Sequence, residues 1–159
     1  KWLFAPVDCS ALLYRDPALA RRANTQAADY LDPVDGAADW NPADYGIHMT
    51  RRARGLPLWF ALIAHGTDAF ADAIDACLTV AREAAGAIDR HPGLELVRAP
   101  SLSVVLFRRL GWRRADYDAW SARLRREGLG LVVPTLWRGE PVLRLCFVNP
   151  RTTIDHLLP

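Results

Sequence analysis

The chain has 159 residues, of which 51% are hydrophobic and 24% charged, and its formal net charge at pH 7 is +2. This composition suits a globular protein with a hydrophobic core, and the nearly balanced charge excludes a general attraction to nucleic acid or to an anionic membrane surface. The cysteines, Cys9, Cys77 and Cys146, lie far apart among apolar residues, so neither a disulfide framework nor a metal knuckle is expected and a reduced, cytoplasmic setting is favoured.

The first third of the sequence predicts little regular structure after its opening residues. Residues 2–14, WLFAPVDCSALLY, read as two short buried strands with a turn at residues 6–8. Residues 15–45 contain DP, DG and NP pairs and little periodicity, which predicts a long loop that is either functional or a plain surface connection. Residues 47–64 favour helix, but Gly55 and Pro57 predict that this helix bends or restarts, with a domain boundary near Leu56.

The remaining residues predict alternating helices and strands. Thr67 is a good N-cap for a helix whose buried stripe recurs every three or four residues. Strands are expected at residues 94–99, 101–109, 129–137 and 141–149, with a helix at 115–128 and a hairpin turn at 138–140. Residues 152–159 read as the beginning of a helix, so both ends are expected to have been interior to a longer polypeptide. The predicted stripe consists of Phe70, Ile74, Cys77, Ala81, Ala84 and Ile88.

Lys1 is the only lysine among 20 lysine and arginine residues. A guanidinium that never loses its proton cannot attack a carbonyl carbon, whereas a lysine amine with a lowered pKa can form an imine. Lys1 is therefore a candidate to form a Schiff base with an aldehyde cofactor. On this observation alone, a leftover surface residue in an arginine-rich chain remains the alternative.

Four segments, taken in their order along the chain, carry a family resemblance: KWLFAPVDCSALLYRD, ADYLDP, DWNPADYGIHMTRRARGLPLWF and VLRLCFVNP. Together they resemble the pyridoxal-phosphate-dependent amino-acid decarboxylases, the group of the aromatic-L-amino-acid, histidine and glutamate enzymes. The resemblance covers nearly the entire chain. It implies an α/β fold of the aspartate-aminotransferase type (PLP fold type I). Residues 1–56 would be the end of the PLP-binding large domain, including the catalytic loop, and residues 57–159 an α+β C-terminal small domain.

The resemblance assigns catalytic roles to two residues. In the family the cofactor lysine follows a histidine and precedes a tryptophan, so Lys1, which precedes Trp2, is expected to be the Schiff-base lysine. Tyr30 in ADYLDP matches the loop tyrosine that protonates Cα after carbon dioxide leaves. A phenol, with a pKa of about 10, keeps its proton in neutral water and can donate it to a carbanion. Relatives with phenylalanine there tend toward oxidative deamination, so Tyr30 favours simple decarboxylation; surface packing of the ring is the alternative.

Arg144 is the expected ligand of the substrate. Strand alternation in VLRLCF places Arg144 with Val142 and Cys146 on one face, opposite Leu143 and Leu145. A guanidinium among apolar neighbours needs an anionic partner, because an unpaired buried charge is costly. The resemblance implies that this partner is the substrate α-carboxylate, and a structural ion pair is the alternative.

Thr50 precedes a cluster of arginines at positions 51, 52 and 54. Family members vary at this position in step with their side-chain preference, and the segment reaches the neighbouring subunit's pocket in the dimer. The resemblance therefore implies that Thr50 contacts cofactor phosphate or substrate. The arginines are expected to form ion pairs at domain or subunit interfaces.

These inferences predict a cytoplasmic homodimer with shared active sites that uses pyridoxal 5′-phosphate to convert an L-amino acid to its amine and carbon dioxide. An aromatic substrate is preferred, because RRARGLPLWF is closer to the RRFR of the aromatic branch than to the glutamate branch. Activity is expected to need residues upstream of Lys1. The alternatives are a PLP-dependent aldehyde synthase and a non-catalytic assembly domain.

Two other site types are not expected. The arginines and aromatics of residues 107–127 could suggest RNA binding, but Tyr117, Trp120 and Leu124 fall on one helical stripe and fit a core. No metal site is expected, because none of the histidines has metal-ligand spacing to another His or Cys. The histidines are His48, His65, His91 and His156.

Overall fold

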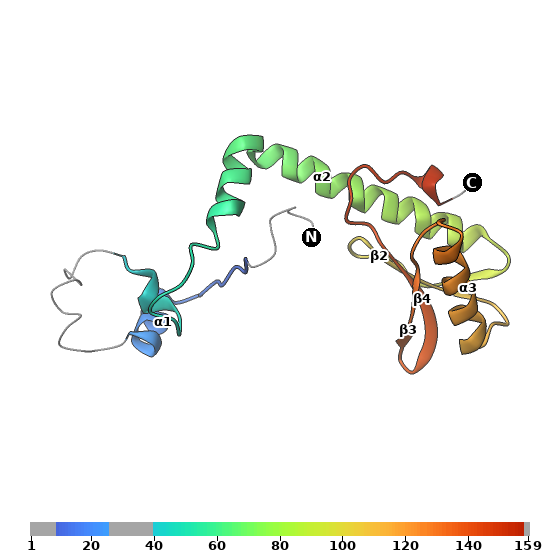
Figure 1. The fold of residues 1–159 in the computed structure, drawn as a ribbon, viewed down its shortest axis with the longest axis horizontal. Helices are drawn as coiled ribbons and strands as arrows, with labels where there is room; N and C mark the ends of the chain where they lie inside the picture. Colours follow the sequence, from blue (N-terminus) through green and yellow to red (C-terminus); the bar gives the residue numbers. More distant parts are fainter. Residues whose placement is uncertain (1–8, 26–39, 158–159) are drawn as a thin grey trace. The chain divides into compact units, whose positions relative to one another are not determined.

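The computed structural model describes residues 9–25 and 40–157 (Figure 1). They belong to two compact units, one ending at Ala64 and one that continues from His65. None of the helices in these two ranges is both long enough and apolar enough to cross a membrane. The elements are α1 (Pro17–Asn24), η1 (Pro42–Tyr45), α2 (Leu56–Arg90), β1 (Leu94–Arg98), β2 (Val104–Arg109), α3 (Arg114–Arg126), β3 (Val133–Trp137), β4 (Glu140–Cys146) and η2 (Ile154–His156).

Both short helices of the first unit begin at an acid or amide followed by proline. Asp16 caps α1 by accepting a hydrogen bond from the amide of Ala18 at 2.9 Å, and Pro17 is the first helical residue. Asn41 and Pro42 begin the 3₁₀ helix η1 in the same way. The prediction of a loop across residues 15–45 is therefore wrong at α1 and η1, because these pairs start helices rather than turns.

Two further sequence predictions for this unit need correction. Residues 9–14 have no regular secondary structure, so the second predicted strand is absent there; the first lies at residues 1–8, outside the described residues. The helix predicted at residues 47–64 begins only at Leu56, directly after Gly55. Pro57 therefore lies in the first helical turn. Amides at this position have no acceptor within the helix, so the missing amide hydrogen of proline costs no helical hydrogen bond.

A single glycine interrupts α2. Gly66 has φ 77° and ψ 159°, values outside the helical region, and the helix resumes at Thr67. The predicted cap at Thr67 is thus one residue too late. Glycine adopts this conformation without a steric clash because it has no Cβ atom. The part of α2 after Gly66 belongs to the second unit.

The second unit contains an antiparallel sheet with the strand order β1-β2-β4-β3. The predicted strands and the predicted helix α3 are confirmed within a few residues at their ends. The hairpin between β3 and β4 turns at Arg138 and Gly139, whose φ angles are 52° and 84°. Positive φ at both central positions is the type I′ geometry, which matches the twist of paired strands.

The core lies between one face of this sheet and the helices α2 and α3 (Figure 1). The predicted stripe of α2 is confirmed from Cys77 onward, while Phe70 and Ile74 are only half-buried. Burial raises the pKa of the Cys77 thiol, because the thiolate would lose its hydration. The buried cluster consists of Cys77, Val80, Ala81, Ala84, Ala85, Ile88, Val105, Phe107, Tyr117, Leu143 and Phe147.

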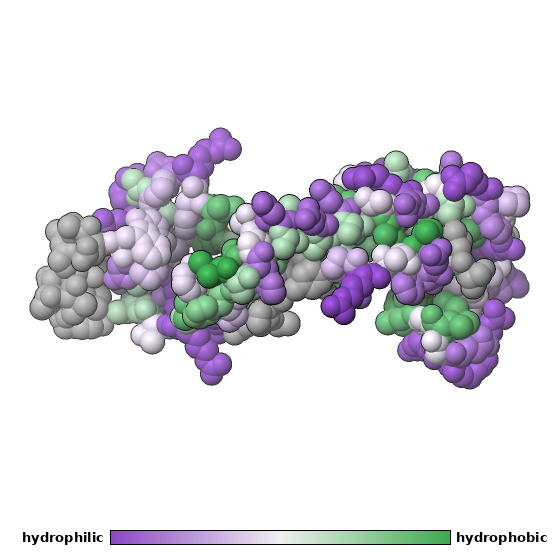
Figure 2. Space-filling view, turned by 90° about the horizontal axis from the view of Figure 1, so that it is seen from above, coloured by the Kyte–Doolittle hydropathy of each residue, from purple (hydrophilic) through white to green (hydrophobic). Residues whose placement is uncertain are grey.

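The opposite face of the sheet has exposed apolar side chains. Val104 of β2 is 42% exposed and Val133 of β3 is 53% exposed. Hydrophobic residues at the molecular surface are coloured green in Figure 2. Beside them a groove of about 210 Å³ is lined by residues that include Arg98, Leu106 and Trp137. This face also holds Arg144, for which the family resemblance predicts contact with the substrate carboxylate.

Candidate functional site

The first unit fixes the chain on both sides of the segment that contains Tyr30. After α1, the amide and the hydroxyl of Thr25 each donate a hydrogen bond to the carbonyl of Arg21, both at 2.8 Å. The description resumes at Trp40, whose ring stacks on Tyr45 with 5.9 Å between the ring centroids. Tyr30 itself lies outside the described residues, as does Lys1, so their predicted roles remain predictions.

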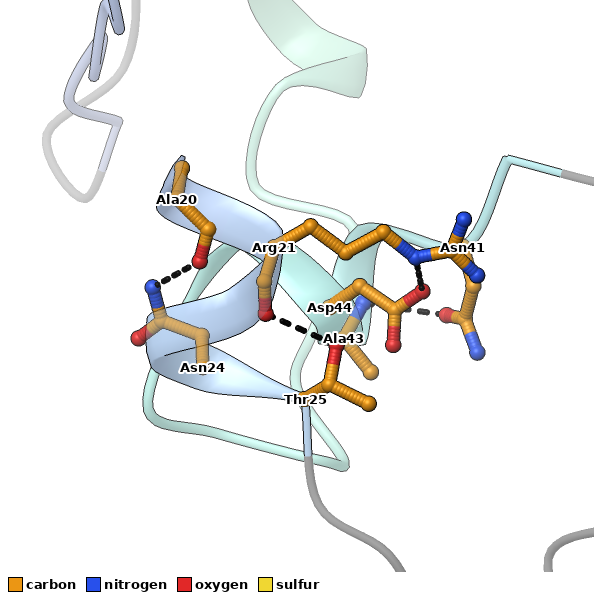
Figure 3. A network of polar contacts seen from close by, with 7 residues as sticks. All are labelled: Ala20, Arg21, Asn24, Thr25, Asn41, Ala43 and Asp44. Carbon is orange, nitrogen blue, oxygen red and sulfur yellow. Dashed lines mark hydrogen bonds and ion pairs between the residues drawn. The ribbon is translucent and has the colours of Figure 1, made fainter. Parts of the chain in front are cut away.

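An ion pair joins α1 to η1 across this segment (Figure 3). Nε of Arg21 lies 3.1 Å from Oδ2 of Asp44. The Asp44 side chain is 11% exposed, whereas that of Arg21 is 52% exposed. A carboxylate that is largely removed from water needs a charged or hydrogen-bonding partner, so Arg21 compensates the burial of Asp44.

The helix η1 is the meeting point of three chain segments. Besides the Arg21 contact, its last residue Tyr45 accepts a hydrogen bond at its carbonyl from the hydroxyl of Tyr14, at 3.0 Å. Its first residue, Pro42, accepts a hydrogen bond at its carbonyl from the guanidinium of Arg51. Asn41 fixes the start of η1 by accepting from the amide of Ala43 at 3.0 Å. Residues 14, 21 and 51 are thereby tied to one short helix.

Thr50 is exposed and precedes Arg51 in an irregular stretch. The guanidinium of Arg51 lies against Gly46 as well, because a Cβ atom at Gly46 would come within 3.1 Å of Nη1. The guanidinium of Arg51 thus contacts the main chain of η1 within its own unit, and the ion pair expected for Arg51 at a domain or subunit interface stays a prediction. The side chain of Thr50 is exposed to solvent, and the hydrogen bond from the neighbouring Arg51 to Pro42 anchors the backbone beside it.

Arg144 lies in β4, opposite Leu106 of β2 and Val133 of β3. Its side chain is exposed, and it has no hydrogen bond or ion pair within the described part of the chain. The sequence predicts a buried guanidinium here, and that expectation is wrong, because the side chain is exposed. Val142, predicted on the same face of the strand, is buried. An exposed guanidinium without a carboxylate partner can bind an incoming anion in a bidentate manner.

The sequence reasoning missed Arg21 and Asp44. A signal was present, because Asp44 follows the Asn41-Pro42 helix start and Arg21 lies in the last turn of the helix that Asp16-Pro17 begins. What the sequence does not contain is the contact itself, which joins residues on either side of the segment 26–39. The structure groups both with Thr50's neighbour Arg51 around η1, while Arg144 belongs to the other unit.

The fold of the chain is that of PLP-dependent enzymes of fold type I. The crystal structure of Oryza sativa TDC with PLP and tryptamine superposes with a TM-score of 0.75 at 20% sequence identity, covering 91% of this chain and 32% of that one. Residues 1–110 match the family described as the pyridoxal-dependent decarboxylase conserved domain, and the chain belongs to this family. Lys1, Tyr30 and Thr50 all fall within the matched residues.

Two relatives match along nearly the whole chain. L-2,4-diaminobutyrate decarboxylase of Rhizobium meliloti (strain 1021) is 35% identical over 163 residues, which cover 98% of this chain and 32% of the relative. Aromatic-L-amino-acid decarboxylase of Bacillus atrophaeus is 26% identical over 167 residues, covering 99% of this chain and 35% of the relative. The chain thus spans about a third of the length of these relatives.

The residues present fit the cofactor of this family, pyridoxal phosphate, in the parts that the chain provides. Lys1 is the only lysine side chain that could bond to the cofactor aldehyde. Thr50 presents an exposed hydroxyl, which is a suitable hydrogen-bond donor for a phosphate oxygen. Within residues 9–25 and 40–157, no group of His, Cys, Asp and Glu side chains could hold a metal ion.

Proposed function

We propose that the protein catalyses the pyridoxal-phosphate-dependent decarboxylation of an L-amino acid, preferably an aromatic one, to the amine and carbon dioxide. The observation that carries this proposal is the family match over residues 1–110, which begins at the only lysine of the chain. Since the chain spans about a third of its relatives, the activity belongs to the whole protein that contains these residues.

Lys1 and Tyr30 have the chemical roles in this proposal. Lys1 would hold the cofactor covalently through its amine, and this requires the amine to lose its proton. Tyr30 would deliver a proton from its hydroxyl to the substrate Cα. The cofactor, when bound, supplies the electron sink that makes loss of the carboxylate possible. The tasks of the chain are therefore to bind, to orient and to donate one proton.

Arg144 and Thr50 would position the substrate. The exposed guanidinium of Arg144 is suited to a carboxylate, for which its planar fork provides two parallel donors. Thr50 would contact cofactor phosphate or substrate through its hydroxyl, and the hydrogen bond from Arg51 to Pro42 supports its backbone. Both proposals require only side chains that are accessible in the described structure.

A second candidate substrate is L-2,4-diaminobutyrate. The observation that favours it is the 35% identity to the diaminobutyrate enzyme of Rhizobium meliloti, which exceeds the 26% identity to the aromatic-amino-acid enzyme. The two candidates differ in chemistry, because an aromatic side chain needs apolar surface whereas an ammonium group needs a carboxylate. A direct competition between both substrates at equal concentration decides between them.

We also propose a cytoplasmic homodimer. The three cysteines are free thiols, with Cys77 buried and Cys146 exposed, which suits a reducing compartment. In the first unit, Trp59, Phe60 and Ile63 of α2 are 53%, 59% and 67% exposed, a patch that association would remove from water. Sedimentation of the full-length protein tests the dimer, and a monomer at micromolar concentration contradicts it.

The decisive experiment uses the full-length protein loaded with pyridoxal phosphate. Amine and carbon dioxide are expected as products, whereas aldehyde with ammonia and hydrogen peroxide would identify an aldehyde synthase. Lys1→Ala should abolish activity together with the absorbance of lysine-bound cofactor. A full-length protein that shows neither the absorbance of lysine-bound cofactor nor any product, and that is unchanged by Lys1→Ala, would leave only the non-catalytic assembly role.

The substrate-binding role has its own matched test. Arg144→Gln should raise KM, because it removes the charge that meets the carboxylate, while Arg125→Gln on exposed helical surface should leave KM as it is. Tyr30→Phe should lower kcat and increase the share of aldehyde. Equal kinetics for Arg144→Gln and Arg125→Gln would remove Arg144 from the site.

A further inference from the structure

We propose that the groove on the uncovered face of the sheet is a binding site for a small aromatic carboxylate, a ligand with one ring and one negative charge. The groove lies within the second unit, and its lining comes from β1, β2, β3 and the loop between β1 and β2. The inference goes beyond the proposed function, because it concerns no step of that reaction.

An irregularity of β1 brings a guanidinium to the groove. Leu96 pairs with Phe107 of β2, but the next partner in the register, Leu106, pairs with Arg98. Val97 is therefore an extra residue, and Arg98 occupies the position that regular pairing would give to this valine. A bulge of this kind turns a side chain in a new direction and is common beside functional sites. The result is that a charged side chain, rather than an apolar one, lines the groove.

The turn between β3 and β4 brings a second guanidinium to the same place. Arg138 has a φ of 52° and is the one residue other than glycine with a positive φ in residues 9–25 and 40–157. This position of a type I′ turn favours asparagine, aspartate or glycine, so an arginine is held there at a conformational cost. The guanidinium carbon of Arg138 lies 5.7 Å from the centroid of the Trp137 ring, and that of Arg98 lies 6.0 Å from it. Two arginines thus stand beside one aromatic residue of the lining.

The charges around the groove select an anionic occupant. Neither Arg98 nor Arg138 forms an ion pair within the described part of the chain. Arg108, on the same face of β2, differs from them because it is paired with Glu95 at 3.2 Å. A guanidinium without a carboxylate partner can bind one through two parallel hydrogen bonds. Arg98, which lines the groove, is therefore placed to bind the negative group of a ligand.

The apolar part of the lining sets the body of the ligand. Leu102 and Val104 are exposed and line the groove together with Leu106 and the indole of Trp137. The groove has a volume of about 210 Å³, and an apolar cavity of about 150 Å³ is enough to hold benzene. Aromatic rings also pack favourably against an indole. One ring therefore fills the groove, whereas a helix of a protein partner, about 10 Å across with its side chains, does not fit into it.

The test is a calorimetric titration of the full-length, cofactor-loaded protein with benzoate and, in parallel, with benzamide, its uncharged analogue. Benzoate should bind more tightly than benzamide. Arg98→Gln should weaken benzoate binding at least about fivefold and leave benzamide binding unchanged, because it removes only the charge. Leu102→Ser should weaken the binding of both, because it removes apolar lining. Arg125→Gln is the matched control, since Arg125 is exposed on α3 and has no ion pair within the described residues.

A second measurement locates the ligand. Fluorotryptophan labels the indole rings, and the fluorine resonance of Trp137 is identified by its absence in Trp137→Phe. This resonance should shift along the calorimetric binding curve of benzoate, and Arg98→Gln should need a proportionally higher concentration for the same shift.

Three results would overturn the proposal. The first is equal benzoate affinity in wild type and Arg98→Gln. The second is benzoate binding that leaves the Trp137 resonance in place, because the ligand would then lie elsewhere in the protein. The third is the absence of benzoate binding, and a lower sedimentation coefficient of Leu102→Ser in that case would assign the groove to a second copy of the protein.

Discussion

The hydroxyl of Tyr117 forms two hydrogen bonds with the main chain of Arg109, accepting from its amide at 3.1 Å and donating to its carbonyl at 3.2 Å. Arg109 lies opposite Leu94 of β1, and the next amide, of Leu110, is the one that donates to Gly93. The main-chain amide and carbonyl of Arg109 therefore point away from β1, to the side of β2 that faces β4. On that side the pairing of β2 with β4 has already ended at Phe107. A side chain of α3 thus completes the hydrogen bonding at the end of β2.

Tyr117→Phe should destabilise the second unit by about 1–2 kcal/mol, because it leaves the part-buried amide of Arg109 without its partner while it preserves the packed ring. The carbonyl of Arg109 keeps its second donor, the amide of Trp112, at 3.3 Å. Urea denaturation followed by circular dichroism measures this loss. Trp112→Phe is the comparison, because it alters only the ring that contacts Tyr117 edge-on at 5.2 Å and keeps the Trp112 amide that donates to the carbonyl of Arg109, so both hydrogen bonds of the Tyr117 hydroxyl should remain. A loss for Tyr117→Phe of less than half a kcal/mol would show that water replaces the hydroxyl.

Core packing predicts a contrast between two leucines of the sheet. Leu143 is 2% exposed in the cluster beneath the helices, whereas Leu136 of β3 is 59% exposed. Leu143→Ala should cost about 2–5 kcal/mol because it leaves a cavity, and Leu136→Ala should cost less than about 1 kcal/mol. Chemical denaturation of both variants is the measurement, and similar losses would mean that Leu143 does not lie in the core.

The turn between β3 and β4 depends on Gly139. Its φ of 84° is unfavourable for any residue with a Cβ atom, so Gly139→Val should destabilise the hairpin by about 1–2 kcal/mol. Gly130→Val provides the control, because Gly130 has open space around its Cα and no positive φ. The melting temperature should fall for the first variant only; an equal fall in both would rule out the turn geometry as the cause.

The thiol of Cys77 should be inert. Burial raises its pKa above the usual 9.0, and a backbone hydrogen bond offsets this only in part. The folded protein therefore holds the thiol proton to higher pH than the unfolded chain, so this contribution to stability is complete below pH 9.0 and declines as the pH rises through and above it. Iodoacetamide at neutral pH should modify the exposed Cys146 and spare Cys77; rapid modification of Cys77 in the folded protein would contradict its burial.

The sequence predicted the second unit well, because its signals are local. The apolar period of residues 77–88, the alternation in the strands and the Arg138-Gly139 turn each indicate one structure. In the first unit the Asp-Pro and Asn-Pro pairs were each compatible with two local structures. Asp16-Pro17 and Asn41-Pro42 can start a turn or a helix, and no local pattern contains the contact between Arg21 and Asp44 that joins the two helices.

The candidate site shows the same division. Lys1 and Tyr30 rest on a family resemblance, and the family itself is confirmed by the match over residues 1–110. Thr50 proves accessible, whereas Arg144 is exposed rather than buried, because the alternation of β4 fixed its face of the sheet but not whether that face is covered. Burial of a sheet face is a property of what packs on it, which the strand sequence alone does not specify.

The uncovered face around Val104, Leu106 and Val133 has a practical consequence for work with the second unit. A polypeptide restricted to residues 65–159 would present this apolar surface to the buffer, and its molecules are expected to adhere to one another reversibly as their concentration rises. Threonine in place of Val104 and Val133 keeps the β-branched shape while adding hydroxyls. The double substitution should therefore reduce self-association and keep the second unit monomeric at the concentrations that spectroscopy needs.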